Sequence, residues 1–243
     1  MRLFGLIGQN LNHSFSENYF ETKFKKEGIS DCKYQNFEIP RINDLPALLK
    51  DNKDLVGLNV TIPYKELVMP FLDEVSPEAE IIGAVNTIQI KNGKTIGYNT
   101  DFLGFEQSLL TFLKGNIRRA LILGSGGAAK AVAFGLRRLG ISYQFVSRRK
   151  IEGSITYDQV ISELILPNLL IINCTPLGTY PKVNDLPPIP KSFLNNSHFI
   201  YDLVYNPEET ALMKLGKSKG CNVKNGLEML QNQAEASWEI WNS

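Results

Sequence analysis

The chain has 243 residues, a formal net charge of +1 and 21% charged residues. This length accommodates one large or two modest domains, and the near-neutral charge gives no general attraction to nucleic acid or anionic membrane. No uninterrupted apolar run approaches the roughly 18 residues that span a bilayer, and residues 1–8 lack the apolar length and cleavage site of a signal peptide. We therefore expect neither nucleic acid nor membrane as a partner.

Cysteine and histidine contents narrow the chemistry further. The three cysteines, Cys32, Cys174 and Cys221, are far apart and odd in number, so they indicate neither a disulfide framework nor a zinc site. A reducing cytoplasm is the expected compartment. Only two histidines, His13 and His198, are present, which argues against an imidazole-based metal site. We expect no metal, so other side chains must carry any chemistry.

The N-terminal half alternates in predicted type. Strand-like apolar runs and helix-like amphipathic segments follow one another as β-α-β-α-β, which predicts an α/β sandwich with a mostly parallel sheet. The expected strands are 3–7, 33–39 and 55–60, and the expected helices run from Ser14 or Ser16 to about Glu27 and over 44–50. Residues 87–98 then predict a hairpin turned at Asn92-Gly93, followed by a helix over 101–113.

Near the midpoint, an apolar run from Arg119 to Leu123 meets glycines that read G-x-G-x-x-A from Gly124 to Ala129. Gly124 permits a tight turn, Gly126 lets the backbone approach a pyrophosphate, and Ala129 lets helix and strand pack closely. Phosphates would meet the free N–H groups of the helix that begins near Gly127. The stretch therefore predicts a strand, a turn and a helix that bind a dinucleotide.

The next predicted strand, 142–146, supports this interpretation. It ends in Ser147, Arg148, Arg149 and Lys150, where an NAD site would normally carry Asp or Glu for the ribose hydroxyls. Three cations suit a 2′-phosphate and hence NADP(H), although a solvated basic turn would have the same composition. Further strands over 169–173 and 198–202 predict that the second half continues as a Rossmann-like unit.

The loop over 175–190 holds five of the twelve prolines, so we expect it to be stiff and to border the site. The final helix, 226–241, carries apolar residues at helical spacing. Trp238 and Trp241 in it are interpreted as packing residues.

Polar residues follow the strands of the first half, where ligands of an open α/β sheet bind. Ser14 and Ser16 follow the first strand, and an N-cap is the alternative role of either. After the third strand, Pro63 fits the first turn of a short helix that would hold Thr61 and Lys65 at the sheet edge, although a lone lysine is usually a solvated surface residue.

Together these motifs resemble shikimate dehydrogenase over nearly the whole chain. The matching segments, in order, are 14–16, 59–65, 83–87, 99–101, 124–128, 173–178, 202–207 and 226–234. The resemblance implies an N-terminal substrate-binding and catalytic domain over 1–101, a Rossmann-like NADP-binding domain over 102–225, and a C-terminal helix over 226–243 that packs back on the substrate domain.

The same resemblance implies an oxidoreductase that acts on a CH–OH group. It would reversibly reduce 3-dehydroshikimate to shikimate with NADPH, in chorismate and aromatic amino acid biosynthesis. Ser14 and Ser16 would hold the substrate carboxylate with Tyr205 nearby, and Asn59 would help to position Thr61 and Lys65. The ring hydroxyls would be bound by Thr61, Asn86, Asp101 and Gln233.

Lys65 and Asp101 match the catalytic pair of the family. Lys65 either exchanges the proton of the reacting oxygen or only polarises that oxygen while Asp101 or water moves the proton. The implied cofactor-binding residues are Gly124, Ser125, Gly126, Gly127, Ala128, Ser147, Arg148, Arg149, Leu203 and Gly226. A monomer or a homodimer is expected.

Three departures from the family pattern stand out. Glu17 replaces the usual proline, Ser147 replaces the usual asparagine, and the chain is shorter between Val146 and Leu169, where part of a β/α crossover is expected to be lost. Three alternatives stay open: a relative that acts on quinate or on both acids with either NAD(H) or NADP(H), a non-catalytic ligand sensor on the same fold, and a Rossmann-like protein with another substrate.

Overall fold

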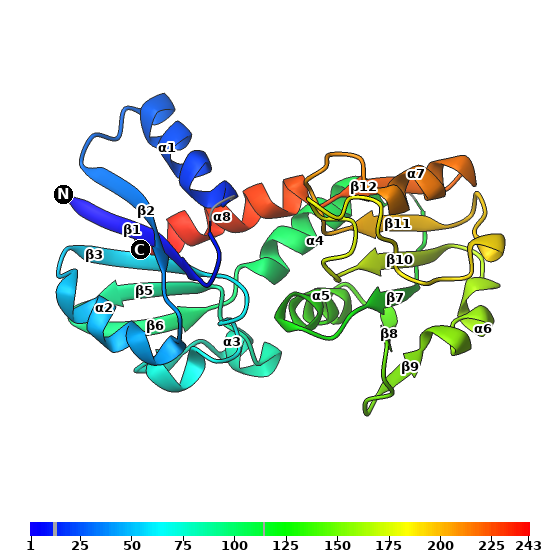
Figure 1. Cartoon of the computed structure of the whole chain (residues 1–243), viewed down its shortest axis with the longest axis horizontal. Coiled ribbons are helices and arrows are strands. Elements are labelled where there is room, and N and C mark those ends of the chain that lie inside the picture. Colours follow the sequence, from blue (N-terminus) through cyan, green and yellow to red (C-terminus); the bar gives the residue numbers. More distant parts are fainter. Residues whose placement is uncertain (12–13, 114) are drawn as a thin grey trace. The chain divides into compact units, whose positions relative to one another are not determined.

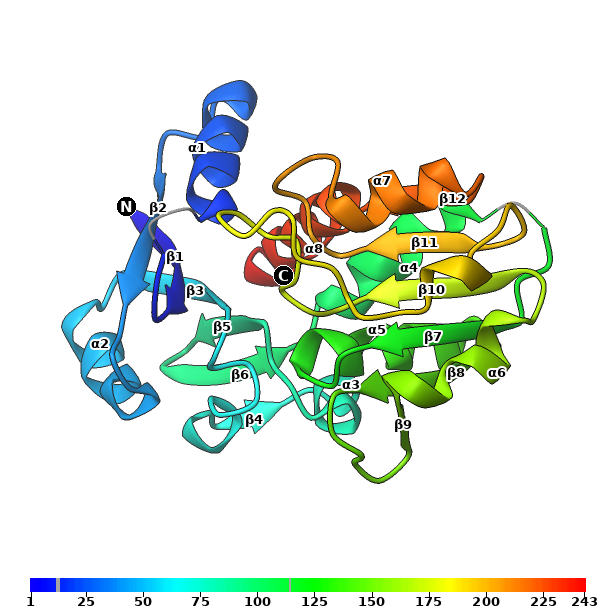
Figure 2. The ribbon, with the colours of Figure 1, turned by 45° about the vertical axis from the view of Figure 1, so that its right-hand side comes forward.

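The computed structural model describes residues 1–11, 14–113 and 115–243, which form two compact units. The first unit comprises Met1–Thr100 together with Ala234–Ser243, and the second comprises Asp101–Gln233. The elements of both can be followed in Figures 1 and 2. The last helix is shared, because its first half belongs to the second unit and its second half to the first.

The first unit is built on a mixed six-stranded sheet in the order β2-β1-β3-β5-β6-β4. β1 pairs in parallel with β2 and β3, β4 pairs in parallel with β6, and β5 runs antiparallel to both neighbours. Its strands are β1 (Arg2–Gly8), β2 (Cys32–Glu38), β3 (Leu55–Val60), β4 (Glu74–Val75), β5 (Thr87–Lys91) and β6 (Lys94–Tyr98). The predicted hairpin is confirmed, with positive φ at both Asn92 and Gly93.

Helices cover both faces of this sheet. One face packs on α2 (Leu45–Asp51), α3 (Pro77–Ile82) and the short 3-10 helices Ile42–Asp44 and Met69–Phe71. The other packs on α1 (Phe15–Glu27) and the second half of α8 (Leu227–Trp241). Trp241 is buried there and donates from Nε1 to the carbonyl of Ile88 at 2.9 Å, over Gly57, where any Cβ would collide with the indole ring.

The second unit contains an all-parallel sheet in the order β12-β11-β10-β7-β8-β9. The strand order reverses between β7 and β10, which is where ligands of doubly wound sheets bind. The strands are β7 (Arg119–Leu123), β8 (Ser142–Ser147), β9 (Ser154–Thr156), β10 (Leu169–Asn173), β11 (Phe199–Asp202) and β12 (Asn222–Asn225).

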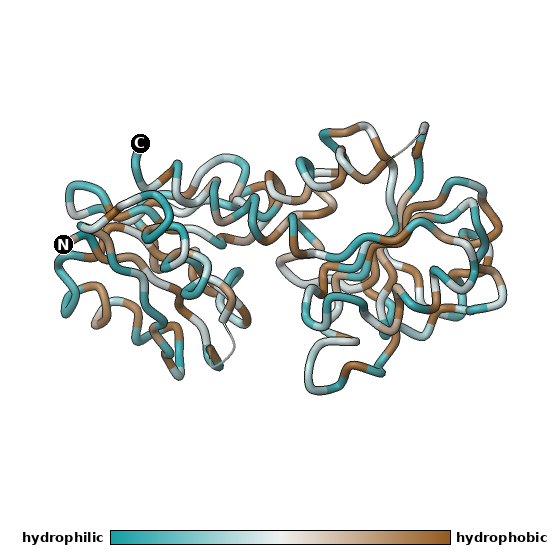
Figure 3. Tube along the Cα trace, turned by 90° about the horizontal axis from the view of Figure 1, so that it is seen from above, coloured by the Kyte–Doolittle hydropathy of each residue, from teal (hydrophilic) through white to brown (hydrophobic). Residues whose placement is uncertain are grey.

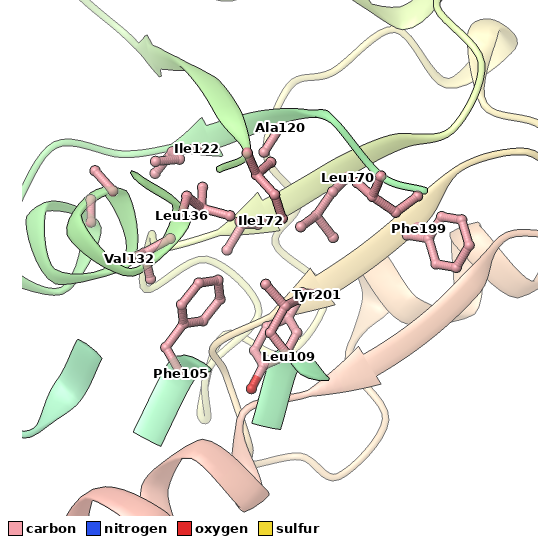
Figure 4. Close-up of a cluster of buried hydrophobic side chains, with 14 of the residues drawn as sticks. Phe105, Leu109, Ala120, Ile122, Val132, Leu136, Leu170, Ile172, Phe199 and Tyr201 are labelled. Carbon is pink, nitrogen blue, oxygen red and sulfur yellow. The ribbon is translucent and has the colours of Figure 1, made fainter. Parts of the chain in front are cut away.

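Two hydrophobic cores sandwich this sheet. On one face, Phe105 and Leu109 of α4 (Asp101–Phe112) and Val132 and Leu136 of α5 (Gly127–Arg138) pack on the central strands (Figure 4). The opposite core lies under α6 (Ile161–Leu164) and α7 (Ala211–Ser218). Figure 3 shows hydrophobic stretches of the chain running through the middle of this unit.

The observed architecture confirms the predicted fold class, a mostly parallel α/β sandwich followed by a Rossmann-like sheet, with α8 returning to the first. In the second unit, residues 148–168 hold only β9, a 3-10 helix (Tyr157–Gln159) and the four-residue α6. The crossover between β9 and β10 thus contains only one 3-10 turn and one turn of α-helix. Within the described ranges, every helix is too short or too polar to cross a membrane.

Candidate functional site

The glycine turn after β7 is open toward solvent on one side and packed on the other. Gly124 has φ of +112°, and a Cβ there would lie 3.3 Å from the carbonyl oxygen of Cys174. At Gly126, by contrast, a Cβ would meet nothing within 4 Å, and no side chain caps α5. The space beside Gly126 is therefore open, and no side chain caps the first N–H groups of α5 there. Uncapped N–H groups beside open space suit the binding of an anion, and we call this arrangement the anion cradle.

The basic stretch begins where β8 ends. Ser147 is its last residue, and its hydroxyl donates to the carbonyl of Arg149, which fixes the turn. Arg148 and Arg149 are exposed, and neither guanidinium forms an ion pair with a described residue. Two cations thus stand at the end of the strand next to the glycine turn, without an acidic partner.

The first turn of α1 leaves one hydroxyl unused. Ser14 occupies the N-cap position in extended conformation, yet its side chain caps nothing. Its Oγ is buried and has no hydrogen-bond partner among the described residues. Ser14 and Glu17 have the spacing of a capping box, but the Glu17 carboxylate accepts from Asn36 Nδ2 at 2.6 Å instead. The capping role that Ser14 could have had is therefore not realised, and its buried hydroxyl is left without a partner among the described residues.

Asn59 and Asn86 belong to a buried polar network, in which both amides have protein partners. Asn59 accepts from the Tyr34 hydroxyl at 2.8 Å and donates to Ser237 Oγ of α8 at 3.0 Å. Asn86 donates to Thr100 Oγ1 at 2.9 Å and accepts from the Thr100 amide at 2.6 Å. This network fixes the ends of β3, β5 and β6 and the approach to α4.

The segment 61–68 differs from its prediction. The Ile62–Pro63 peptide is cis, and turns rather than a short α-helix follow it, so the helix predicted to begin at Pro63 is wrong. The fixed points are backbone bonds: Thr61 N donates to Ile7 O at 3.0 Å, and Val85 N donates to Lys65 O at 2.7 Å. These bonds place a half-buried Lys65 beside the carboxyl ends of β1 and β3.

Three further predicted residues lie in the second unit. Asp101 is buried at the first position of α4, where a carboxylate is favoured by the helix dipole. Gln233 is buried on α8, close to Gly104 of α4. A Cβ on Gly104 would lie only 2.8 Å from the backbone nitrogen of Gln233. Tyr205 is half-buried after β11, and this burial raises the pKa of its phenol.

The structure also shows residues to which sequence reasoning gave no role, Asn173 and Asp202. They pair across neighbouring strands β10 and β11, and Asn173 Nδ2 donates to Asp202 Oδ1 at 2.8 Å. Both are fully buried. Their signal was present, because each is the polar residue that ends an apolar strand. Leu203 and Gly226 lie beside them, and a Cβ on Gly226 would collide with the Leu203 carbonyl.

Two other features stand apart from these residues. A cavity of about 660 Å³ lies at the amino ends of β1 and β3, lined among others by Arg2, Lys53 and Ile90, and it contains none of the predicted site residues. In the described part of the chain, no three His, Cys, Asp or Glu side chains group as a metal site would require.

Comparison with known proteins agrees with the motifs. Residues 6–88 match the model of the family described as shikimate dehydrogenase substrate binding domain. A Clostridium beijerinckii protein named shikimate dehydrogenase (NADP(+)) is 42% identical over 256 residues, covering 99% of this chain and 92% of the relative.

Two solved structures are similar over the full length. The crystal structure of shikimate dehydrogenase 1 from Peptoclostridium difficile has a TM-score of 0.86 and 37% identity, covering 100% of this chain and 92% of that one. Shikimate 5-dehydrogenase from Thermus thermophilus, in complex with NADP(H) and shikimate, has a TM-score of 0.88 and 32% identity, covering 99% and 93%. Similarity at this level over both units shows that the chain belongs to the shikimate dehydrogenase family.

Proposed function

We propose that this protein is an NADP-dependent shikimate dehydrogenase, which reversibly reduces 3-dehydroshikimate to shikimate. The observation that carries the proposal is the buried, unpartnered hydroxyl of Ser14, in the same unit as a turn that holds Lys65 and a network that holds Asn86. A compact anionic polyol requires such hydroxyl and amide partners, since each polar group left unpaired in a buried site costs about 1–3 kcal/mol.

Ser14 and Ser16 are assigned to the substrate carboxylate, with Tyr205 as a further hydroxyl for it. Ring hydroxyls are assigned to Thr61, Asn86, Asp101 and Gln233. Asn59 has its oxygen and an N–H engaged by Tyr34 and Ser237, which supports a positioning role rather than contact with substrate.

Lys65 is assigned the proton of the reacting oxygen. In reduction, its ammonium group donates a proton to the carbonyl oxygen as that oxygen becomes a hydroxyl, and in oxidation the neutral amine takes the proton back. Asp101 is assigned as the carboxylate partner of the pair. A Lys65 that only polarises the oxygen, while Asp101 or water moves the proton, is the competing assignment.

The second unit is assigned to NADP(H), which supplies the hydride when bound. The residues present suit it: Gly124, Gly126 and the uncapped start of α5 form an anion cradle, and Arg148 and Arg149 provide cations for a 2′-phosphate. Ser125, Gly127 and Ala128 complete the cradle, and Ser147 shapes the basic turn. Leu203 and Gly226 are assigned to the nicotinamide side. A cytoplasmic location and a monomeric or homodimeric state are part of the same proposal.

The initial rate of NADP⁺ reduction with shikimate, measured beside quinate and beside NAD⁺, tests the function. Turnover confined to shikimate with NADP⁺ is the expected result. A preference for quinate or NAD⁺ would support the alternative substrate or cofactor, and ligand binding without turnover would support a sensor.

Substitution of Lys65 tests the catalytic assignment. Lys65→Ala should lose most of its turnover, by about 10²-fold or more, while NADPH binding stays unchanged. Lys33→Ala is the matched control, because this exposed lysine of β2 lies in the same unit and has no assigned role. Equal turnover in the two variants would remove Lys65 from the mechanism. The pH profile of a Lys65→Arg variant would separate proton transfer from polarisation, since arginine stays protonated.

A further inference from the structure

Asp202 is a fully buried carboxylate that the proposed reaction does not use. It lies at the carboxyl end of β11, and burial raises its pKa. Among the described residues no lysine or arginine forms an ion pair with it. Its three hydrogen bonds come instead from neutral groups on separate segments: Asn173 Nδ2 at 2.8 Å, Val204 N at 3.1 Å and Thr210 Oγ1 at 2.6 Å. A buried carboxylate satisfied only by neutral donors is costly to retain for stability alone.

The bond between Asp202 and Asn173 connects Asp202 indirectly to the glycine turn after β7. Asn173, held by Asp202, accepts from both the amide of Thr175 at 3.0 Å and its hydroxyl at 2.6 Å. Thr175 Cγ2 and the Cys174 carbonyl are the groups that a Cβ on Gly124 would meet first, each at 3.3 Å. The segment that Asp202 and Asn173 hold is therefore the wall against which the glycine turn packs.

The bonds from Val204 N and Thr210 Oγ1 hold the segment that follows β11. Val204 N is held directly, and the preceding Leu203 carbonyl is the group that excludes a side chain at Gly226. Thr210, which donates to Asp202, also caps α7 by accepting from Met213 N at 3.2 Å. One carboxylate thus joins the wall of the glycine turn, the segment beside Gly226 and the start of α7.

We infer that Asp202 is a positioning residue for the nucleotide: through Asn173 and Val204 it sets the two backbone segments that border Gly124 and Gly226. The inference rests on the proposed NADP(H) function of this unit. Asp202 acts only as an acceptor of hydrogen bonds and exchanges no proton with substrate or cofactor. Loss of the carboxylate leaves the Val204 N–H without its acceptor and leaves the Asn173 amide with only its longer bond to the Leu177 carbonyl, at 3.4 Å, so both segments are freed to shift.

Asp202→Ala and Asp202→Asn test the inference, with Tyr201→Phe as the matched control. Tyr201 precedes Asp202 on β11, and its hydroxyl pairs with Ser108 Oγ at 2.7 Å, so Tyr201→Phe removes a buried hydrogen bond on the α4 side of the same strand. The measurements are the Kd for NADPH from its fluorescence, kcat and KM for shikimate, and stability from urea unfolding.

The expected pattern separates positioning from stability. Asp202→Ala should raise the Kd for NADPH by about tenfold or more, with little change in KM for shikimate. Asp202→Asn retains an acceptor oxygen for Asn173 and Val204 and should stay within about threefold of the wild type. Tyr201→Phe should lower stability while leaving the Kd for NADPH unchanged.

If Asp202→Ala leaves the Kd for NADPH unchanged and lowers stability as Tyr201→Phe does, Asp202 has only a structural role. If Asp202→Ala and Asp202→Asn weaken NADPH binding equally, the hydrogen-bonding account is contradicted. If Asp202→Ala does not fold, Thr175→Val decides. It keeps a methyl group against Gly124 and removes the hydroxyl, which donates to Asn173 Oδ1 at 2.6 Å and accepts from Leu177 N at 3.3 Å. A Kd raised about threefold or more supports the inference, and an unchanged Kd overturns it. Wild-type protein that binds NADPH but does not oxidise shikimate would end the proposed function and leave this inference testable.

Discussion

The two units prepare for their ligands by different means. In the first, the groups that we assign to substrate are side chains, and buried side chains such as Asn59, Thr87 and Ser237 hold one another in place. In the second, the groups that we assign to the nucleotide are largely backbone, at positions where Gly124 and Gly126 lack a Cβ. A side-chain site therefore depends on many residue types at once, whereas a backbone site depends on the absence of a side chain at a few positions.

The largest effect is expected from a side chain placed in the backbone site. Gly124→Val would force a β-branched residue into φ of +112° and toward the Cys174 carbonyl, and we expect NADPH affinity to fall by about 10²-fold. Isothermal titration calorimetry with NADPH measures this affinity. Gly126→Ala is the comparison, because its φ is ordinary and its surroundings are open, so it should weaken NADPH binding without lowering the melting temperature. A Gly124→Val protein that binds NADPH normally would refute the backbone account.

The next effect should come from the side-chain network. Asn59→Leu leaves the Tyr34 hydroxyl and Ser237 without their amide partner, and should cost about 2–3 kcal/mol of unfolding free energy in urea together with a raised KM for shikimate. Thr95→Val serves as the control, since it removes two part-buried hydrogen bonds between the Thr95 hydroxyl and Asp73, elsewhere in the same unit, and should lower stability alone. A raised KM in both variants would show that general loosening, not the network, governs the site.

A smaller effect is expected at the exposed basic turn. Arg148→Ala should raise KM for NADP⁺ by about tenfold, because one charge-assisted contact to the 2′-phosphate is lost in a solvated position. The KM for NAD⁺, which lacks that phosphate, should not change. If both nucleotides are weakened equally, Arg148 supports the turn and does not select the cofactor.

The smallest expected effect is a pH dependence in the second unit. Burial lowers the pKa of His198 below its usual value near 6.5, so the unfolded chain binds the proton more readily than the folded one. Stability should therefore fall as pH is lowered through about 6.5. Urea unfolding at about pH 7.5 and about pH 5.5 measures this, and His198→Gln should flatten the difference. An unaltered difference in that variant would assign the dependence to other groups.

The sequence predicted the strand, turn and helix around Gly124 well because their determinants are local. Gly124, Gly126 and Ala129 lie within six residues, and each acts through its own lack of bulk. The strand and helix on either side are confirmed as β7 and α5. Lys65 and Asp101, in contrast, were singled out mainly through family resemblance, and their roles stay predictions.

What the sequence could not reveal depends on distant partners. Asn59 and Ser237 are 178 positions apart, and nothing near either residue indicates the other. From the sequence, Ser14 was equally suited to cap a helix, and only the three-dimensional structure shows that its hydroxyl forms no capping bond. The helix predicted at Pro63 is wrong because proline also suits the cis turn that the chain adopts there.

The sharing of α8 has a consequence for biosynthesis. Met1–Thr100 are synthesised before the second unit, yet the same first unit also needs Ala234–Ser243, which are synthesised only after all of Asp101–Gln233. Until then the face of its sheet around Phe4 and Phe20 lacks Trp241. The first unit therefore cannot complete its fold until the second unit has been synthesised. Premature termination before Ala234 would preserve every strand of the second unit. It would leave an apolar face of the first unit exposed to chaperones and proteases.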